Sequence, residues 1–147
     1  MSLGQQIADD MKAAMRAKDA PRLEAIRLLR AAIQRREVDE RVTLDDTGIL
    51  QVIEKLIRQG QESMAQFEGA GRTDLVVKER ASLAVFTSYL PTPLAPEEVE
   101  ALIDAAIRDT QAVSIKDMGK VVAYLKPRLQ GRADMAAVSG RVRERLA

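Results

Sequence analysis

Hydrophobic positions recur at intervals of three and four residues along almost the whole chain. This period is typical of helices that each bury one face. No segment of useful length alternates apolar and polar residues, so no strand is expected. The pattern predicts an all-α fold with an N-terminal bundle of about four helices and a small C-terminal domain of three helices.

Polar residues in front of the apolar stripes mark the expected helix starts. Ser2 precedes the first stripe, Asp19 the second and Asp45 the third, and Asp74 is the expected cap of the fourth helix. Gly60 falls in the middle of the third stripe, where glycine costs about 1 kcal/mol relative to alanine. We therefore expect another helix to cross close to Gly60.

A proline-rich stretch, Pro91-Thr-Pro-Leu-Ala-Pro96, cannot continue a helix, because proline has no amide hydrogen and constrains the residue before it. It divides the chain into an expected N-terminal domain at residues 1–90, a linker at 91–96 and a C-terminal domain at 97–147. In the C-terminal domain, Ser114 and Asp117 resemble a capping box. The helix that follows is expected to end near Lys126.

The second helix has an unusually broad apolar arc, which suggests contacts with two neighbours. A wide arc that stays partly uncovered is also a possible docking patch. The arc consists of Ala25, Ile26, Leu28, Leu29, Ala32 and Ile33.

The composition excludes several kinds of chemistry. The chain has no cysteine and no histidine, so it has neither a thiolate zinc site nor the commonest general base. Its serines lack a histidine to activate them, and its paired carboxylates are sequence neighbours that point in different directions on a helix. No phosphate-binding glycine loop is present. We expect no catalytic residue, no metal and no cofactor.

The N-terminal sequence does not resemble a signal peptide, and no apolar run reaches the roughly 20 residues that span a membrane. The absence of cysteine fits a reducing compartment. We therefore expect a cytoplasmic protein that does not interact with a membrane.

The net charge is only +1, but the basic residues are clustered in two segments. Residues 11–36 contain eight Lys or Arg against two acids, a balance of 8 − 2 = +6, and residues 111–147 contain eight against three, a balance of 8 − 3 = +5. Such segments fit a phosphate-bearing partner. Alternatively, acidic partners from elsewhere in the fold neutralise them.

Candidate contacts for such a partner occur in both segments. Lys116 and Lys120 lie one turn apart, opposite an apolar face, and Gly119 beside them leaves the backbone uncovered. Three further cations follow towards the next turn. The candidate RNA-binding residues are Lys116, Lys120, Lys126, Arg128 and Arg132, with a second basic patch at Arg27, Arg30 and Arg35.

Several short motifs resemble the YqeY family. In the C-terminal part they are Asp117-Met-Gly-Lys-Val121, the Lys126-Pro127 pair and Gly131-Arg-Ala-Asp134. Earlier motifs are Asp10-Met-Lys-Ala-Ala14, Ala70-Gly-Arg-Thr-Asp-Leu75 and Tyr89-Leu-Pro91. The resemblance covers nearly the whole chain, but Met135-Ala-Ala137 follows Asp134 where the family leads us to expect a glycine.

The resemblance implies an all-helical protein whose C-terminal domain is similar to the tail of the B subunit of glutamine-dependent tRNA amidotransferase. In that enzyme, a carbon–nitrogen ligase with glutamine as amido-nitrogen donor, the tail helps to hold the tRNA and the catalytic steps lie in other domains. The family therefore implies tRNA or another structured RNA as a partner. Autonomous catalysis is not expected, although an association with amidotransferase activity is.

Two alternatives remain open at this stage. The chain is an interaction module that docks on an amidotransferase or another complex without binding RNA, or it is an amidotransferase component with a catalytic contribution of its own. An exposed apolar patch would favour the first alternative. Release of ammonia from glutamine by the purified protein would favour the second.

Overall fold

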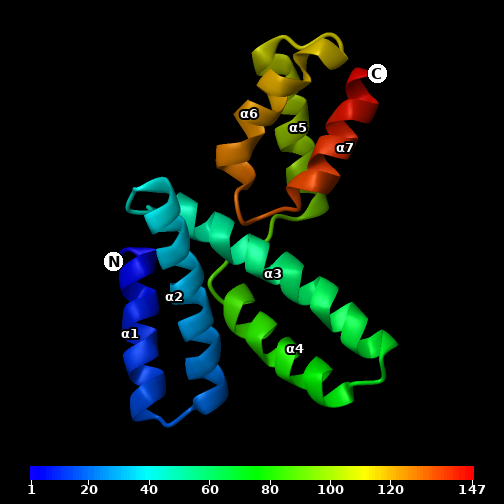
Figure 1. Cartoon of the computed structure of the whole chain (residues 1–147). Helices are drawn as coiled ribbons and strands as arrows, with labels where there is room; N and C mark the ends of the chain where they lie inside the picture. The colour runs from blue at the N-terminus through cyan, green and yellow to red at the C-terminus, as the bar shows by residue number, and fades with distance from the viewer. The chain divides into compact units, whose positions relative to one another are not determined.

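The computed structural model describes residues 1–147, and it is entirely helical (Figure 1). The helices are α1 (Leu3–Arg16), α2 (Ala20–Glu40), α3 (Asp46–Gly69), α4 (Thr73–Thr87), α5 (Pro96–Thr110), a 3-10 turn η1 (Ile115–Asp117), α6 (Met118–Leu129) and α7 (Met135–Leu146). The predicted all-α fold is thus confirmed, with four helices before the proline-rich stretch and three α-helices after it. No helix combines the length and the apolar character needed to cross a membrane.

The contacts divide the chain into two compact units, Met1–Leu90 and Pro91–Ala147, which we call unit 1 and unit 2. Each unit has its own hydrophobic core. The core of unit 1 is centred on Ile7, Ile26, Leu29 and Ile53, and that of unit 2 on Ile103, Val121, Leu125, Leu129 and Val142.

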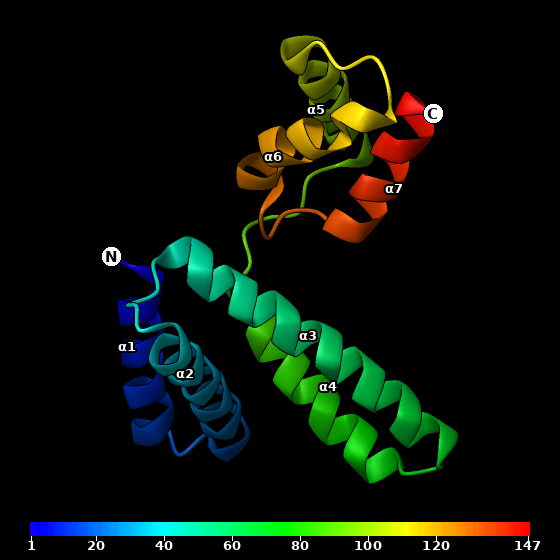
Figure 2. The same cartoon turned by 45° about the horizontal axis from the view of Figure 1, so that its top comes forward.

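Unit 1 consists of two antiparallel helix pairs, α1 with α2 and α3 with α4, which Figures 1 and 2 show from two directions. The side-chain oxygens of Ser2, Asp19 and Asp45 accept hydrogen bonds from the first turns of α1, α2 and α3. These caps confirm three predicted helix starts. The fourth prediction was wrong: Arg72 precedes α4, and Asp74 lies in its first turn, where it pairs with the Arg72 guanidinium at 3.0 Å.

Gly60 brings α3 and α4 together as expected. A Cβ atom at this position would lie 2.5 Å from Leu83 Cδ2 and 2.9 Å from Glu79 Oε1, both on α4. Any side chain at this crossing requires Leu83 and Glu79 to shift, which accounts for a glycine in the middle of a helix.

Unit 2 is a bundle of α5, α6 and α7, with η1 leading into α6. The Leu94 amide donates to the Arg132 carbonyl at 2.9 Å, and Arg132 Nε donates to the Thr92 carbonyl at 3.0 Å. Residues 92–94 are therefore fixed to the turn between α6 and α7. The prediction that α6 ends near Lys126 was wrong, because the helix continues to Leu129. Pro127 lies inside its last turn, where the missing amide hydrogen removes a single hydrogen bond.

Tyr89, at the end of unit 1, is 8% exposed, and its hydroxyl donates to Asp10 Oδ2 of α1 at 2.6 Å. Burial, and then this hydrogen bond, raise the pKa of Tyr89 above its ordinary value. The bond fixes the last residues of unit 1 to its first helix.

Tyr89→Phe should destabilise unit 1 by about 1–2 kcal/mol at neutral pH, since it leaves the half-buried Asp10 carboxylate without its hydroxyl donor. In the parent protein the unfolded state loses the Tyr89 proton above about pH 10 while the folded state keeps it, so stability falls as the pH rises further. Urea unfolding between pH 7 and 11 should show a smaller alkaline fall in the variant. An unchanged stability at neutral pH would contradict the structural role of this hydrogen bond. The matched control is Tyr124→Phe in unit 2.

Candidate functional site

The loop before α6 is organised by the carboxylate of Asp117. This carboxylate accepts from the Val113 amide at 2.9 Å and from the Ser114 amide at 3.3 Å, and it pairs with Lys120 at 3.4 Å. The hydrogen bond from Val113, followed by those from Ser114 and Lys120, lowers the pKa of Asp117. A capping box was predicted for Ser114 and Asp117. The hydrogen bond from the Ser114 amide to the Asp117 carboxylate is one of the two bonds of such a box.

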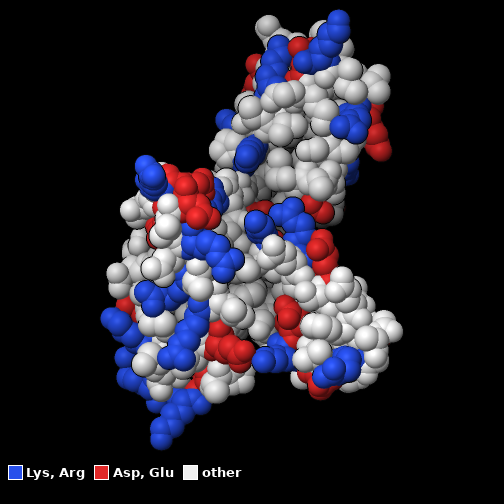
Figure 3. Space-filling view, viewed as in Figure 1, with Lys and Arg blue, Asp and Glu red and all other residues white.

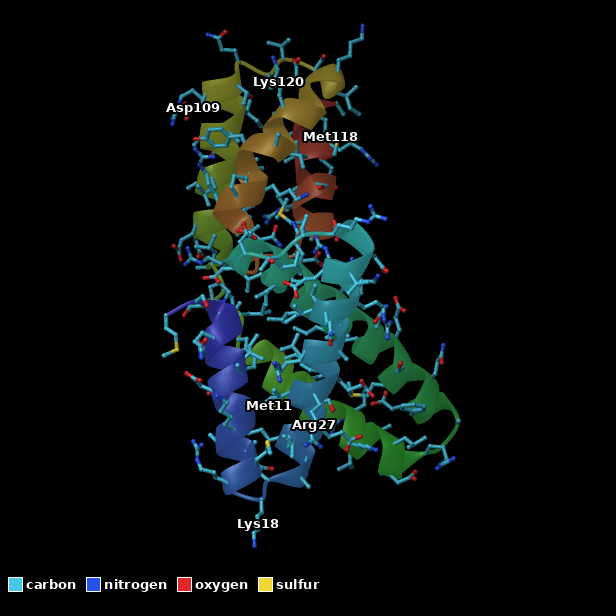
Figure 4. All side chains as sticks on the ribbon, turned by 60° about the vertical axis from the view of Figure 1, so that its left-hand side comes forward. Met11, Lys18, Arg27, Asp109, Met118 and Lys120 are labelled. Atoms are coloured by element: carbon cyan, nitrogen blue, oxygen red, sulfur yellow. The ribbon has the colours of Figure 1, made fainter.

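The two lysines at this loop are exposed but differ in their partners. Lys120 is paired with Asp117, whereas Lys116 makes no ion pair. Gly119 has open space where a side chain would project, and Val113 beside the lysines is 86% exposed. Figure 4 shows Lys120 at the end of unit 2 where α6 begins. The loop therefore combines exposed cations, an uncovered backbone position and an exposed apolar side chain.

The other three cations predicted in unit 2 lie at the opposite end of α6. Lys126 is exposed and unpaired, and the Arg128 guanidinium covers the Tyr124 ring at 3.7 Å and donates to the Tyr124 carbonyl. Arg132 is held on the carbonyl of Thr92. The sequence places these five residues within 17 positions of one another, but this does not bring them to one end of the bundle. The reason is that α6 continues to Leu129 and its 12 residues span about 18 Å.

The remaining basic residues of unit 2 are largely neutralised by acids of α5. Arg141 and Arg145 of α7 both pair with Glu100, and Arg145 also pairs with Asp104. In this part of the chain, the interpretation of basic segments as solvated faces with acidic partners from elsewhere is therefore largely correct.

The first basic segment differs, since most of its cations lack an acidic partner. Of its eight Lys and Arg, only Arg22 and Arg36 pair with carboxylates, of Asp10 and Glu40, which leaves 8 − 2 = 6. Figure 3 shows Lys and Arg side chains along α1 and α2 towards the turn that joins them. The six unpaired residues are Lys12, Arg16, Lys18, Arg27, Arg30 and Arg35.

None of the nearby acids forms an ion pair with these six residues. Asp9 accepts from Gln5, Asp10 from Tyr89, and Asp19 caps α2. Glu24 pairs with Lys78 of α4 at 3.3 Å. The net positive balance of the sequence thus becomes a cationic surface in the folded protein.

The predicted second patch separates into two places. Arg27 and Arg30 line a groove between α1 and α2, whereas Arg35 lines another groove between α2 and α3. Lys12, Arg16 and Lys18 were not among the predicted site residues. The feature of the sequence that could have identified them is the positive charge balance of residues 11–36.

Leu28 was expected within the apolar arc of α2 but is 53% exposed. Leu28 lines a groove that is also bordered by Gly60 of α3 and Phe86 of α4. An uncovered apolar position of this kind is the feature expected of a docking module.

Two of the serines have structural hydrogen bonds. The chain has no histidine, Ser2 caps a helix, and the Ser88 hydroxyl donates to the carbonyl of Val85 at 2.6 Å. No three Asp or Glu side chains are grouped so that they could hold a metal ion. The protein is therefore a two-unit helical protein whose distinctive surface chemistry is basic.

Comparison with known proteins then gives the family. The model of the family described as Yqey-like protein matches residues 4–146, and the chain belongs to this family. It is 31% identical over 139 residues to altered inheritance of mitochondria protein 41, mitochondrial, of Pyrenophora tritici-repentis, covering 92% of this chain and 76% of the relative. The protein of the same name from Eremothecium gossypii is 35% identical over 109 residues, covering 72% of this chain and 60% of the relative. These comparisons confirm the predicted family.

The same relatives overturn the predicted cytoplasmic location, because each is named as a mitochondrial protein. The prediction depended partly on the absence of cysteine, which fits any reducing compartment. This feature therefore does not distinguish the cytosol from other reducing compartments.

Proposed function

We propose that this protein is an accessory module that binds a structured RNA, with tRNA as the first RNA to test. The observation that carries the proposal is the set of exposed cations without carboxylate partners, six on α1 and α2 together with Lys116 and Lys126 on unit 2. Unpaired surface cations attract phosphates without reading bases, and the counterions they displace make the affinity depend on salt.

The resemblance of unit 2 to the tRNA-holding tail of the amidotransferase B subunit supports this choice of partner. It also supports an association with glutamine-dependent amidotransferase activity, to which this chain would contribute binding. In unit 2 the proposed phosphate contacts are Lys116, Lys120, Lys126, Arg128 and Arg132. Among them, Lys116 and Lys126 are free of internal partners, whereas Arg132 also holds residues 92–94 in place.

Substituting Lys116→Glu together with Lys126→Glu should weaken tRNA binding at least tenfold at low salt, because both side chains are exposed and unpaired. The measurement is a fluorescence-anisotropy titration of labelled tRNA at 50 and 200 mM salt. Circular dichroism should show unchanged helical content, since no internal ion pair is removed.

A matched control with the same charge change is Lys55→Glu with Arg58→Glu, two exposed cations of α3 that line the groove with Arg35 and belong to neither the contacts of unit 2 nor the groove between α1 and α2. Because the two variants have the same net charge, their affinities for tRNA can be compared directly, and the control should bind tRNA much more tightly than the test variant. Absence of tRNA binding by the parent protein at 50 mM salt would refute the proposed function.

A second candidate is a docking module for another protein, favoured by the exposed Leu28 and the shallow groove around it. A partner retained after nuclease treatment, and lost with Leu28→Asp, would support this candidate. Retention that requires intact RNA would support RNA binding instead.

A further inference from the structure

A groove of unit 1 lies between α1 and α2 and has a volume of about 1120 Å³. Met11 and Gln5 line it from α1, and Arg27, Arg30 and Gln34 line it from α2. Figure 4 shows Met11 on α1 and Arg27 on α2 side by side on the same face of the helix pair. Two guanidinium groups and two carboxamides therefore border one open concavity.

The carboxylates that border this groove are all bound to backbone amides. Glu37 accepts from the Leu44 amide at 2.8 Å, Asp45 from the Gly48 amide at 2.9 Å, and Asp46 from the Leu3 amide at 2.9 Å. These bonds fix the loop at residues 43–46. The three carboxylates keep their negative charge, but none of them forms an ion pair with Arg27 or Arg30.

The arginines themselves have almost no internal partners. Arg27 makes no hydrogen bond or ion pair, and the contact of Arg30 is to the Met11 sulfur, with 3.1 Å between Nη1 and Sδ. A thioether sulfur is a weak acceptor, so the Arg30 guanidinium keeps nearly all of its donor capacity. Both guanidinium groups thus border the groove and have donors available to an anion.

The spacing of these groups suits phosphates. Arg27 and Arg30 are three residues apart on α2 and hence neighbours on one helix face. A guanidinium can donate two parallel hydrogen bonds to one phosphate, which makes arginine more specific for phosphate than lysine. Two lysines extend the positive charge beyond the groove, Lys12 on α1 and Lys18 in the turn between the helices. Figure 4 shows Lys18 projecting from the end of the helix pair.

We propose that the groove between α1 and α2 is a binding site for the phosphate backbone of RNA, with Arg27 and Arg30 as its central contacts. This inference rests on the proposed function and specifies where on unit 1 the phosphate backbone would be held and which two of its cations would hold it. RNA is favoured over a membrane surface because a helix that lies on lipid needs an exposed apolar face. The apolar face of α1, with Ile7 and Ala14, is buried in the core, and so is that of α2 apart from Leu28.

The test compares the full-length protein with Arg27→Glu plus Arg30→Glu by anisotropy titration of labelled tRNA between 50 and 200 mM salt. The variant should bind at least tenfold more weakly at 50 mM, and the slope of log affinity against log salt should decrease by about 1 to 2 as up to two phosphate contacts are lost. Arg27→Lys plus Arg30→Lys should restore the slope and part of the affinity, because it keeps the charges and removes the paired donors.

Lys55→Glu with Arg58→Glu again serves as the matched control, since these residues have the same three-residue spacing on a helix of the same unit. A groove variant that binds like this control overturns the groove site and leaves the proposed function standing. No binding of tRNA by the parent protein overturns both. Loss of binding to phosphatidylserine vesicles in the groove variant, with tRNA binding unchanged, would assign the groove to a membrane and also overturn the proposal.

Discussion

Leu125→Ala should unfold unit 2 and leave unit 1 folded. Leu125 is fully buried in the core shared by α5, α6 and α7, and a Leu→Ala change at such a site costs about 2–5 kcal/mol. Unit 2 has only 147 − 90 = 57 residues, and a core of this size supplies roughly 3–5 kcal/mol in total. Hydrogen exchange followed by mass spectrometry should show loss of protection in α5, α6 and α7 and retained protection in α1 to α4.

Two other leucines provide controls with the same chemical change. Leu29 is fully buried in the core of unit 1, so Leu29→Ala should lower protection in α1 to α4 only. Leu28, its neighbour in sequence, is 53% exposed, so Leu28→Ala should change the free energy of unfolding by no more than about 0.5 kcal/mol. If Leu125→Ala lowered protection equally in both units, the two cores would not be independent.

The helices of this protein were predictable from the sequence because each depends on local signals. The caps at Ser2, Asp19 and Asp45 act within one turn, so their effects can be derived from a few neighbouring residues. Asp74 has the same residue type, but a competing interaction with Arg72 leaves it inside the first turn. Local signals therefore identify a helix start to within one or two residues.

The exposure of Leu28 was not predictable in the same way. Periodicity shows that the apolar arc of α2 is broad, but the number of helices that cover this arc is decided by tertiary packing. The same limit applies to Arg132, whose hydrogen-bond partner Thr92 is 40 residues away in sequence.

The candidate site was predictable in its residue types but not in its distribution. The charge balance of residues 11–36 and 111–147 was similar, +6 against +5, yet the structure treats the two segments differently. Arg141 and Arg145 form ion pairs with acids of α5. Glu24, by contrast, forms its ion pair with Lys78 of α4, and Arg27 has no ion pair. A charge count therefore identifies a basic segment, and only the positions of the acids determine which part of it remains available to an anion.

Gly60→Leu should destabilise unit 1 by about 3 kcal/mol and lower its melting temperature by roughly 15 °C. A Cβ atom at this position already lies within 3 Å of Leu83 and Glu79, so a full leucine side chain forces α3 away from α4. Gly60→Ala should have a much smaller effect, because the gain of about 1 kcal/mol in helix propensity offsets the shift of the Leu83 side chain. Thermal unfolding followed by circular dichroism measures both variants.

Gly69→Leu is the matched control, since Gly69 belongs to the same helix and has no atom within 4 Å of the position where a Cβ would lie. This variant should retain the stability of the parent protein. An equal loss of stability in the two leucine variants would mean that leucine destabilises the helix α3 itself, and that the contact between α3 and α4 is not the reason for glycine at position 60. A loss confined to Gly60→Leu would identify the close approach of α3 and α4 as the reason for glycine at this position, and would explain why an apolar stripe is interrupted where the packing is tightest.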